Sequence, residues 1–158
     1  GAIMRVQLKR LDGILKRLRA RKAAMTSVLC GGKGYVLAPV HDAAGDCGVL
    51  TAVQVESLAR LRAVQGTLKE RGLSASSPID SGMHVYSNWE PILAQRAAHH
   101  PALNAFRLTG RRYTYTPDMC PRTTDVLSRT LFVATPFKDT LPRVKSRARA
   151  FRAALESA

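Results

Sequence analysis

Two short segments of the sequence hold most of the side chains that could do chemistry. One is His84-Val85-Tyr86-Ser87-Asn88-Trp89, and the other is Asp118-Met119-Cys120-Pro121-Arg122-Thr123. Arg122, together with Arg129 just beyond it, has the planar guanidinium that binds a phosphate or carboxylate through two parallel hydrogen bonds. The alternative is a structural ion pair with a nearby acid, Asp118 or Asp125. We favour the ion pairs over an anion site.

Other chemical patterns are weak or absent. His99-His100 offers two metal-ligating side chains, but adjacent residues of a helix do not face one another, and no Cys, Asp or Glu has suitable spacing. Gly31-Gly32-Lys33-Gly34 follows a helical pattern instead of joining a strand to a helix, which indicates a helix stop and not a phosphate loop. Cys and His are residue types that can act as a nucleophile and its base, but the sequence does not indicate that Cys120 and His84 meet. No motif of a known nucleophile site is present in the sequence. The sequence therefore predicts no catalytic residue and no metal site.

The periodicity of apolar residues predicts an α+β fold. Helical spacing covers 2–29, 58–71 and 141–156, whereas 35–40, 49–55, 73–76 and 130–134 have the length and composition of strands. We expect a small, mostly antiparallel sheet with helices on one face. The predicted organisation is a single domain over 1–158, in which a long amphipathic helix over 1–30 precedes an α+β part over 35–158.

The finer features follow from local signals. Ser57 is a candidate N-cap, Pro91 and Pro121 suit first helical turns, and a short helix is expected from Trp89 to His99. The stretch 101–117 is predicted to be irregular. Two apolar stripes are expected to face the core, as are Val126 and Leu127. The first helix contributes Met4, Leu8, Leu11, Leu15, Leu18, Met25 and Leu29, and the last contributes Leu141, Val144, Ala148, Phe151 and Leu155.

The charge of the chain is high and uneven. The 25 Lys and Arg residues against 11 Asp and Glu give a net charge of +14. Eight bases against one acid in 1–22, and five against one in 141–158, supply +7 and +4 of it. The two terminal helices therefore either attract phosphates or an acidic partner, or present solvated faces, and these readings are equally supported.

The sequence also indicates the cellular compartment of the protein. No apolar run is long enough for a membrane span, no secretory signal is present, and three cysteines without Cys-x-x-Cys spacing indicate reduced thiols. We expect a soluble, cytoplasmic protein.

The order of the motifs resembles the C-terminal, small domain of the DegT/DnrJ/EryC1/StrS family of pyridoxal-phosphate-dependent sugar and cyclitol aminotransferases. The resemblance comprises the His-x-Tyr segment, a variable Pro-rich loop, Cys-Pro-x-Thr, then Leu-x-Arg-Thr and a short apolar strand. Gly1-Ala2-Ile3 and Gln7 to Leu15 are similar to the family's linker helix between its two domains. The resemblance implies an aspartate-aminotransferase-like fold, and a chain that begins in the middle of a family helix.

The resemblance also implies what this chain does and lacks. The family holds pyridoxal phosphate on a lysine in a Ser-x-x-Lys context, and none of the seven lysines here has Ser three positions before it. We therefore expect this chain alone to bind no cofactor and to be inactive in transamination. Its partner would be a large pyridoxal-phosphate-binding domain or subunit, within a homo-oligomer acting on a keto-sugar or cyclitol.

Two residues are candidates for substrate binding. In the family the His-x-Tyr segment lies near the substrate entrance, so His84 and Tyr86 would line it. The alternative, which we favour for each residue, is a loop histidine satisfied by backbone and a tyrosine that, with Trp89, serves the core.

A second class of function also remains open. The chain departs from the family at Thr123-Thr124, where relatives carry a carboxylate-bearing helix, and in its basic, acid-poor last helix. If Met4 were a natural start, the large domain would never have been attached. The protein would then be a non-catalytic, stand-alone module that binds an acidic protein or nucleic acid through its terminal helices. Nucleic acid is not favoured, because these helices lack interleaved aromatics.

Overall fold

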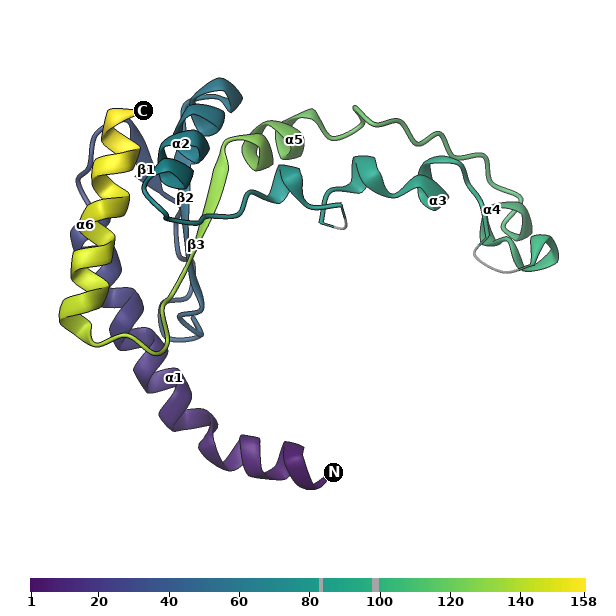
Figure 1. Ribbon diagram of the computed structural model, residues 1–158. Coiled ribbons are helices and arrows are strands. Elements are labelled where there is room, and N and C mark those ends of the chain that lie inside the picture. Colours follow the sequence, from purple (N-terminus) through teal and green to yellow (C-terminus); the bar gives the residue numbers. More distant parts are fainter. Residues whose placement is uncertain (83, 98–99) are drawn as a thin grey trace. The chain divides into compact units, whose positions relative to one another are not determined.

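The structure is a computed structural model that describes residues 1–82, 84–97 and 100–158. It contains two compact units (Figure 1). The first, called here the sheet unit, consists of Gly1–Ser76 and Arg129–Ala158, and the second, the 77–128 unit, consists of Ser77–Ser128. The expected division into a helix over 1–30 and an α+β part over 35–158 stays a prediction.

The sheet has three antiparallel strands in the order β1-β2-β3. They are β1 (Tyr35–Leu37), β2 (Leu50–Val55) and β3 (Thr130–Ala134). Val53 of β2 pairs with Leu37 of β1 on one side and with Leu131 of β3 on the other. Side chains of a strand alternate between the two faces of its sheet, and every second residue of β2 is accordingly buried. The antiparallel sheet is confirmed.

The predicted strand over 73–76 does not form. Ser76 makes an isolated bridge to Phe132, with backbone hydrogen bonds of 3.1 Å and 2.7 Å between the two residues. Pro78 stands at the next hydrogen-bonding position of such a ladder and has no N–H to donate. The pairing therefore does not continue past Ser76, and the residues 73–75 that precede it form no strand.

Three long helices pack with this sheet, and their limits match the predicted ones closely. They are α1 (Ala2–Leu29), α2 (Leu58–Glu70) and α6 (Leu141–Ser157). The Ser57 hydroxyl caps α2 by accepting from the backbone N–H of Arg60 at 3.1 Å. Gly31, at φ +73°, follows the end of α1. Within the described residues, none of these helices combines the length and apolar character that crossing a membrane requires.

The core lies where α1 and α6 pack together against the sheet and α2. Its large, fully buried side chains come from every one of these elements: Leu29, Val53, Leu61, Val64, Leu131, Val144, Phe151 and Leu155. The last helix buries its predicted stripe except at its first position, because Leu141 remains exposed at the start of the helix. The fold therefore rests on contacts distributed from the first helix to the last.

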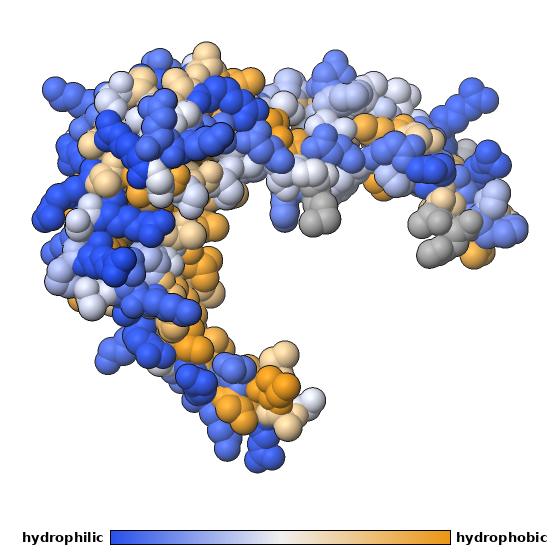
Figure 2. Space-filling model, viewed as in Figure 1, coloured by the Kyte–Doolittle hydropathy of each residue, from blue (hydrophilic) through white to orange (hydrophobic). Residues whose placement is uncertain are grey.

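The apolar stripe of α1 is buried only in its second half. Met25 and Leu29 lie in the core, whereas Ile3, Met4, Leu8 and Leu11 are exposed, Leu8 to 61%. Figure 2 shows hydrophobic side chains along one side of this helix. The prediction that the whole stripe faces a core is wrong for the first half, since α1 extends beyond the sheet unit's other elements (Figure 1).

The 77–128 unit consists of short helical turns joined by loops. Its elements are η1 (Pro78–Asp80), η2 (Tyr86–Asn88), α3 (Glu90–Leu93), η3 (Pro101–Leu103), α4 (Ala105–Leu108) and α5 (Pro121–Ser128). The buried side chains here include Val85 and Asn104, and α5 packs against η1.

Three predictions for this unit need correction. The helix expected to reach His99, which lies outside the described residues, ends at Leu93 because Gln95 adopts a positive φ of 51°. The stretch 101–117 contains η3 and α4, each with a side-chain N-cap. Val126 is 41% exposed, since neighbouring residues of a helix point about 100° apart and Leu127 is the half-buried one.

Candidate functional site

The Tyr86 side chain joins the two segments that the sequence singled out. Its hydroxyl donates to the carbonyl oxygen of Pro117 at 2.7 Å and accepts from the backbone N–H of Cys120 at 3.0 Å. Both partners immediately flank the Asp118-Met119 turn, so one phenol holds the start of the Cys-Pro segment against η2. The 77–128 unit thus brings together residues more than thirty positions apart.

His84 precedes this contact and is exposed. Its backbone N–H donates to the Ser81 hydroxyl at 3.3 Å, and the same hydroxyl lies in a short hydrogen bond with Nδ1 of the ring. Asn88 also reaches back, donating to the Ser81 carbonyl at 3.2 Å. Because Ser81 orients the ring through Nδ1, Nε2 is the nitrogen that remains for a ligand.

The aromatic residues of the segment do not form a common core. Tyr86 is half-buried, whereas Trp89 is 47% exposed. The expectation that both are core aromatics is therefore wrong for Trp89. Tyr86 is held by polar contacts that use both hydrogen-bonding capacities of its hydroxyl.

The two arginines beyond the Cys-Pro segment have different settings. Arg129 donates to the Val55 carbonyl at 3.2 Å, which ties the start of β3 to the end of β2. Arg122 is exposed on α5. The side chain of Thr116 and a backbone N–H bond the carboxylate of Asp118 and hold its pKa below the usual value. Local hydrogen bonds, and not an ion pair with an arginine, thus account for the lowered pKa of Asp118.

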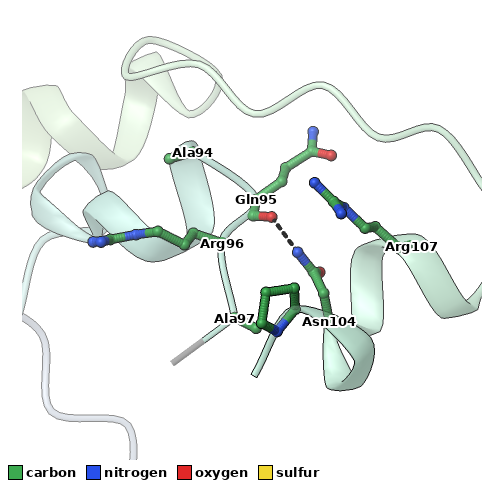
Figure 3. A pocket seen from close by; sticks show the side chains of 7 residues that line it. Ala94, Gln95, Arg96, Ala97, Asn104 and Arg107 are labelled. Atoms are coloured by element: carbon green, nitrogen blue, oxygen red, sulfur yellow. Dashed lines mark hydrogen bonds between the residues drawn. The ribbon is translucent and has the colours of Figure 1, made fainter. Parts of the chain in front are cut away.

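A cavity of about 490 Å³ lies between α3 and α4 in the 77–128 unit. Its polar lining comes from Gln95, Arg96, Asn104 and Arg107, and Figure 3 shows the side chains of Gln95 and Arg107 extending toward one another while that of Arg96 extends away. Arg96 forms an ion pair with Glu90. Arg107 has no hydrogen bond or ion pair with another described residue, so its guanidinium is available for a small anion at this cavity.

A polar contact joins the two walls of the cavity. Buried Asn104 donates from Nδ2 to the Gln95 carbonyl at 2.8 Å, and its Oδ1 accepts from the Phe106 N–H at 3.0 Å. The amide side chain therefore bonds across the cavity and caps α4 at the same time (Figure 3). Gln95 sits in the left-handed region to make its carbonyl available, a conformation that costs a non-glycine residue about 1 kcal/mol.

Sequence reasoning missed Gln95, Asn104 and Arg107. Asn104 could have been found, since Asn directly before Ala-Phe-Arg-Leu is an N-cap signal for a short helix. The positive φ of Gln95 has no sequence signature, because glycine or asparagine usually takes that position.

Other reactive side chains do not assemble into a site. Cys30, Cys47 and Cys120 are free and exposed. Over the described ranges, no three His, Cys, Asp or Glu side chains gather as metal ligands. His99 of the histidine pair lies outside those ranges.

Comparison with known proteins identifies the fold. The chain matches the crystal structure of 3-amino-5-hydroxybenzoic acid synthase with a TM-score of 0.62 and 17% sequence identity. The match covers 99% of this chain and 38% of that one. The chain has the fold of part of that synthase. The sequence resemblance to the DegT/DnrJ/EryC1/StrS aminotransferases is thereby confirmed at the level of the fold.

The comparison is limited to structure. No family model and no curated protein sequence matches the chain. The chain spans little more than a third of the length of the synthase.

Proposed function

We propose that this chain is the small domain of a pyridoxal-phosphate-dependent aminotransferase that acts on a keto-sugar or cyclitol. The observation that carries the proposal is the agreement between two independent signals. The motif order resembles the small domain of that family, and the structural match extends over 99% of the chain but only 38% of the synthase. A domain of this kind would work with a large domain that supplies the cofactor site.

The residues of this chain do not fit a Schiff-base site. Lys22 is engaged in an ion pair with Asp46, and the other six lysines are exposed: Lys9, Lys16, Lys33, Lys69, Lys138 and Lys145. A nucleophilic lysine requires desolvation or a neighbouring cation in an enclosed site. When bound by the large domain, the cofactor would supply the electron sink for amino transfer. The part of this chain would be to bind and orient the substrate.

The geometry separates the roles of the two candidate residues. His84 is exposed and its Nε2 is available, so it suits a direct hydrogen bond to a hydroxyl of the substrate. The hydroxyl of Tyr86 is occupied by Pro117 and Cys120. Tyr86 is therefore a positioning residue that fixes the segment on which His84 lies.

The exposed half of α1 supports the proposal that another domain packs against this chain. Ile3, Met4, Leu8 and Leu11 place a row of large apolar side chains at the surface, and contiguous apolar surface of this kind marks an interaction site. In the proposed enzyme this row would pack against the large domain. The homo-oligomer expected from the family would be formed by the complete protein.

The proposal is tested by reading the coding sequence upstream of Gly1 and by reconstitution. We expect an in-frame domain with a Ser-x-x-Lys segment, and we expect that joining it to this chain gives transamination of a keto-sugar or cyclitol. In that protein His84→Gln should raise KM with little change in kcat, because it removes a substrate contact and no chemical group. Ser87→Ala, a neighbouring substitution, is the matched control.

The outcomes distinguish the proposal from its alternatives. An upstream sequence without a large domain, together with failure of any added large domain to give activity, would contradict the aminotransferase proposal. Equal effects of His84→Gln and Ser87→Ala would leave the enzyme assignment intact but would remove His84 from the substrate entrance.

A further inference from the structure

The basic residues of α6 are explained only in part by the fold, and not by the proposed active site. The helix and the residue that follows it carry five bases against Glu156 alone, a net charge of +4. Arg152 is used internally, since it pairs with Glu156 and donates to the Val28 and Gly31 carbonyls. The others, called here the α6 basic face, are all exposed: Arg143, Lys145, Arg147 and Arg149.

Helical spacing arranges these four bases in two rows. Residues four apart lie one above the other, so Arg143 and Arg147 form one row and Lys145 and Arg149 the other, with Ser146 between them. Buried residues such as Val144 and Ala148 hold the opposite side of the helix in the core. Figure 2 shows hydrophilic side chains over this helix. The two rows lie about 160° apart around the helix axis, so they flank the buried side and do not form one continuous surface.

The arrangement is unfavourable for the isolated helix. Like charges four residues apart destabilise a helix by about 0.2–0.5 kcal/mol per pair. The first turn of α6 contains no acid, and bases near a helix N-terminus oppose its dipole. The nearest compensation is Asp139, whose carboxylate lies 3.6 Å from Nε of Arg143. Arg147 lies over the ring of Phe151, 6.0 Å from its centroid. Over the described ranges, Lys145 and Arg149 form no ion pair.

A hollow of about 280 Å³ lies beside the second row. It is lined by Leu141, Pro142, Lys145 and Arg149 and therefore presents two bases and no acid. The small residues Ser146 and Ala153 on the exposed part of the helix allow an extended polyanion to approach the bases closely. A phosphate seated in the hollow would meet both charges of the row.

The chemistry of this face distinguishes nucleic acid from an acidic protein. The core of a protein interface is depleted of charge and enriched in apolar and aromatic anchors, and the α6 basic face offers only Leu141 at its edge. Interfaces with nucleic acid are more polar and much more positive. The lack of exposed aromatic residues on α6 argues against stacking of bases but not against contacts with phosphates. We propose that the Lys145–Arg149 row of the α6 basic face binds the phosphate backbone of nucleic acid without reading its sequence. The exposed apolar half of α1, by contrast, fits a protein.

The test is a titration of this chain against a fluorescently labelled mixed-sequence duplex DNA and against single-stranded RNA, repeated over a range of salt. Affinity should fall steeply with salt, since each neutralised phosphate contributes about 0.9 to the logarithmic slope for a duplex. The variant Lys145→Gln/Arg149→Gln should bind at least about tenfold more weakly, with a slope lower by about 2. Its melting temperature should be unchanged or higher.

The matched control changes the same charge elsewhere. Lys9→Gln/Lys69→Gln removes two exposed bases from α1 and α2 and should leave binding within about twofold of the parent. Equal losses in the two variants would overturn the proposal, because only net charge would then matter. Polyglutamate that competes as well as the nucleic acid at equal charge would also overturn it and assign the surface to an acidic protein.

Discussion

The hydroxyl of Tyr86 accepts a hydrogen bond from the backbone N–H of Cys120, a residue 34 positions further along the chain. The same hydroxyl donates to the Pro117 carbonyl, so a single side chain closes a loop that contains α3, η3 and α4. Few side chains described in the 77–128 unit are fully buried, so polar contacts of this kind contribute to its shape. The position of His84 relative to the Cys-Pro segment therefore depends on Tyr86.

Tyr86→Phe removes this contact without changing the size of the ring. A net hydrogen bond contributes about 0.5–1.5 kcal/mol, so hydrogen exchange of the Cys120 amide should accelerate several-fold. Amide exchange followed by NMR gives the measurement. Tyr115→Phe is the control, because Tyr115 contacts Phe106 and Tyr113 through its ring. Equal exchange at Cys120 in both variants would show that the hydroxyl does not hold the loop.

The apolar stripe of α1 allows the same Leu→Ala substitution to be compared at a buried and at an exposed position. Leu29 is 0% exposed and Leu8 is 61% exposed. Leu29→Ala should lower the free energy of unfolding by about 2–5 kcal/mol, because it removes buried methyl groups and leaves a cavity. Leu8→Ala should change it by less than about 0.5 kcal/mol. Urea unfolding of both variants measures the two changes. A large loss of stability in Leu8→Ala would contradict the structure, because it would mean that Leu8 is buried.

Gly48 lies so close to α1 that a side chain would collide with it. A Cβ there would stand 2.8 Å from the backbone nitrogen of Arg19 and 2.9 Å from the carbonyl carbon of Leu18. The residue also has φ +74°. Gly48→Ala should therefore destabilise the fold both by backbone strain, about 1–2 kcal/mol, and by overpacking, about 1–3 kcal/mol.

Gly31→Ala separates these two effects. Gly31 has nearly the same φ of +73°, but a Cβ there would meet no atom within 4 Å. Its substitution should cost the strain alone, about 1–2 kcal/mol. The melting temperatures of the two variants give the difference. Equal losses would show that the loop around Gly48 moves away from α1 at no cost.

Asp46 should make stability depend on pH in the acid range. The hydrogen bond from Lys22, and then the one from the Gly48 N–H, hold the pKa of this carboxyl below its ordinary value of 3.8. A carboxyl whose pKa is lowered by folding stabilises the protein above the unfolded pKa, and that stability is lost as the pH falls through the folded pKa. The melting temperature should therefore decrease when the pH is lowered below 3.8.

Asp46→Asn removes this contribution. The variant should be less stable than the parent at neutral pH, and the difference should shrink as the pH falls to about 2.5. Asp12→Asn removes the same charge from the exposed surface of α1 and is the control. A constant difference between Asp46→Asn and the parent at all pH values would contradict the assignment.

The three long helices and three of the strands were predictable because local signals and burial agree there. Ser57 and Gly72 frame α2, and the β-branched run that includes Val53 and Val55 marks β2. The failures occur where one local feature overrides a pattern. The fourth strand is reduced to a bridge at Ser76 that Pro78 keeps from continuing, and the left-handed conformation of Gln95 ends α3.

The sequence predicted which two segments contain the candidate site, but not how their side chains are arranged in space. The sequence identifies His84, Tyr86 and the Cys-Pro segment, yet nothing in residue spacing shows that Tyr86 bonds to Pro117 and Cys120. The cavity at Arg107 depends on Asn104 reaching the carbonyl of Gln95, a contact between two loops. Such contacts depend on how the chain returns on itself, which short-range patterns do not encode.

The uneven burial of α1 makes its two halves differ in thermodynamic character. A helix of about a dozen residues is marginal in water without tertiary contacts, and the exposed half also contains Gly13. From Met25 onward, packing on the core keeps the helix formed. A protein that binds the exposed half would therefore have to order part of the helix as it docks. The affinity at that surface would be set by helix propensity as well as by contact, and the ordered helix would transmit the orientation of the bound protein to the sheet.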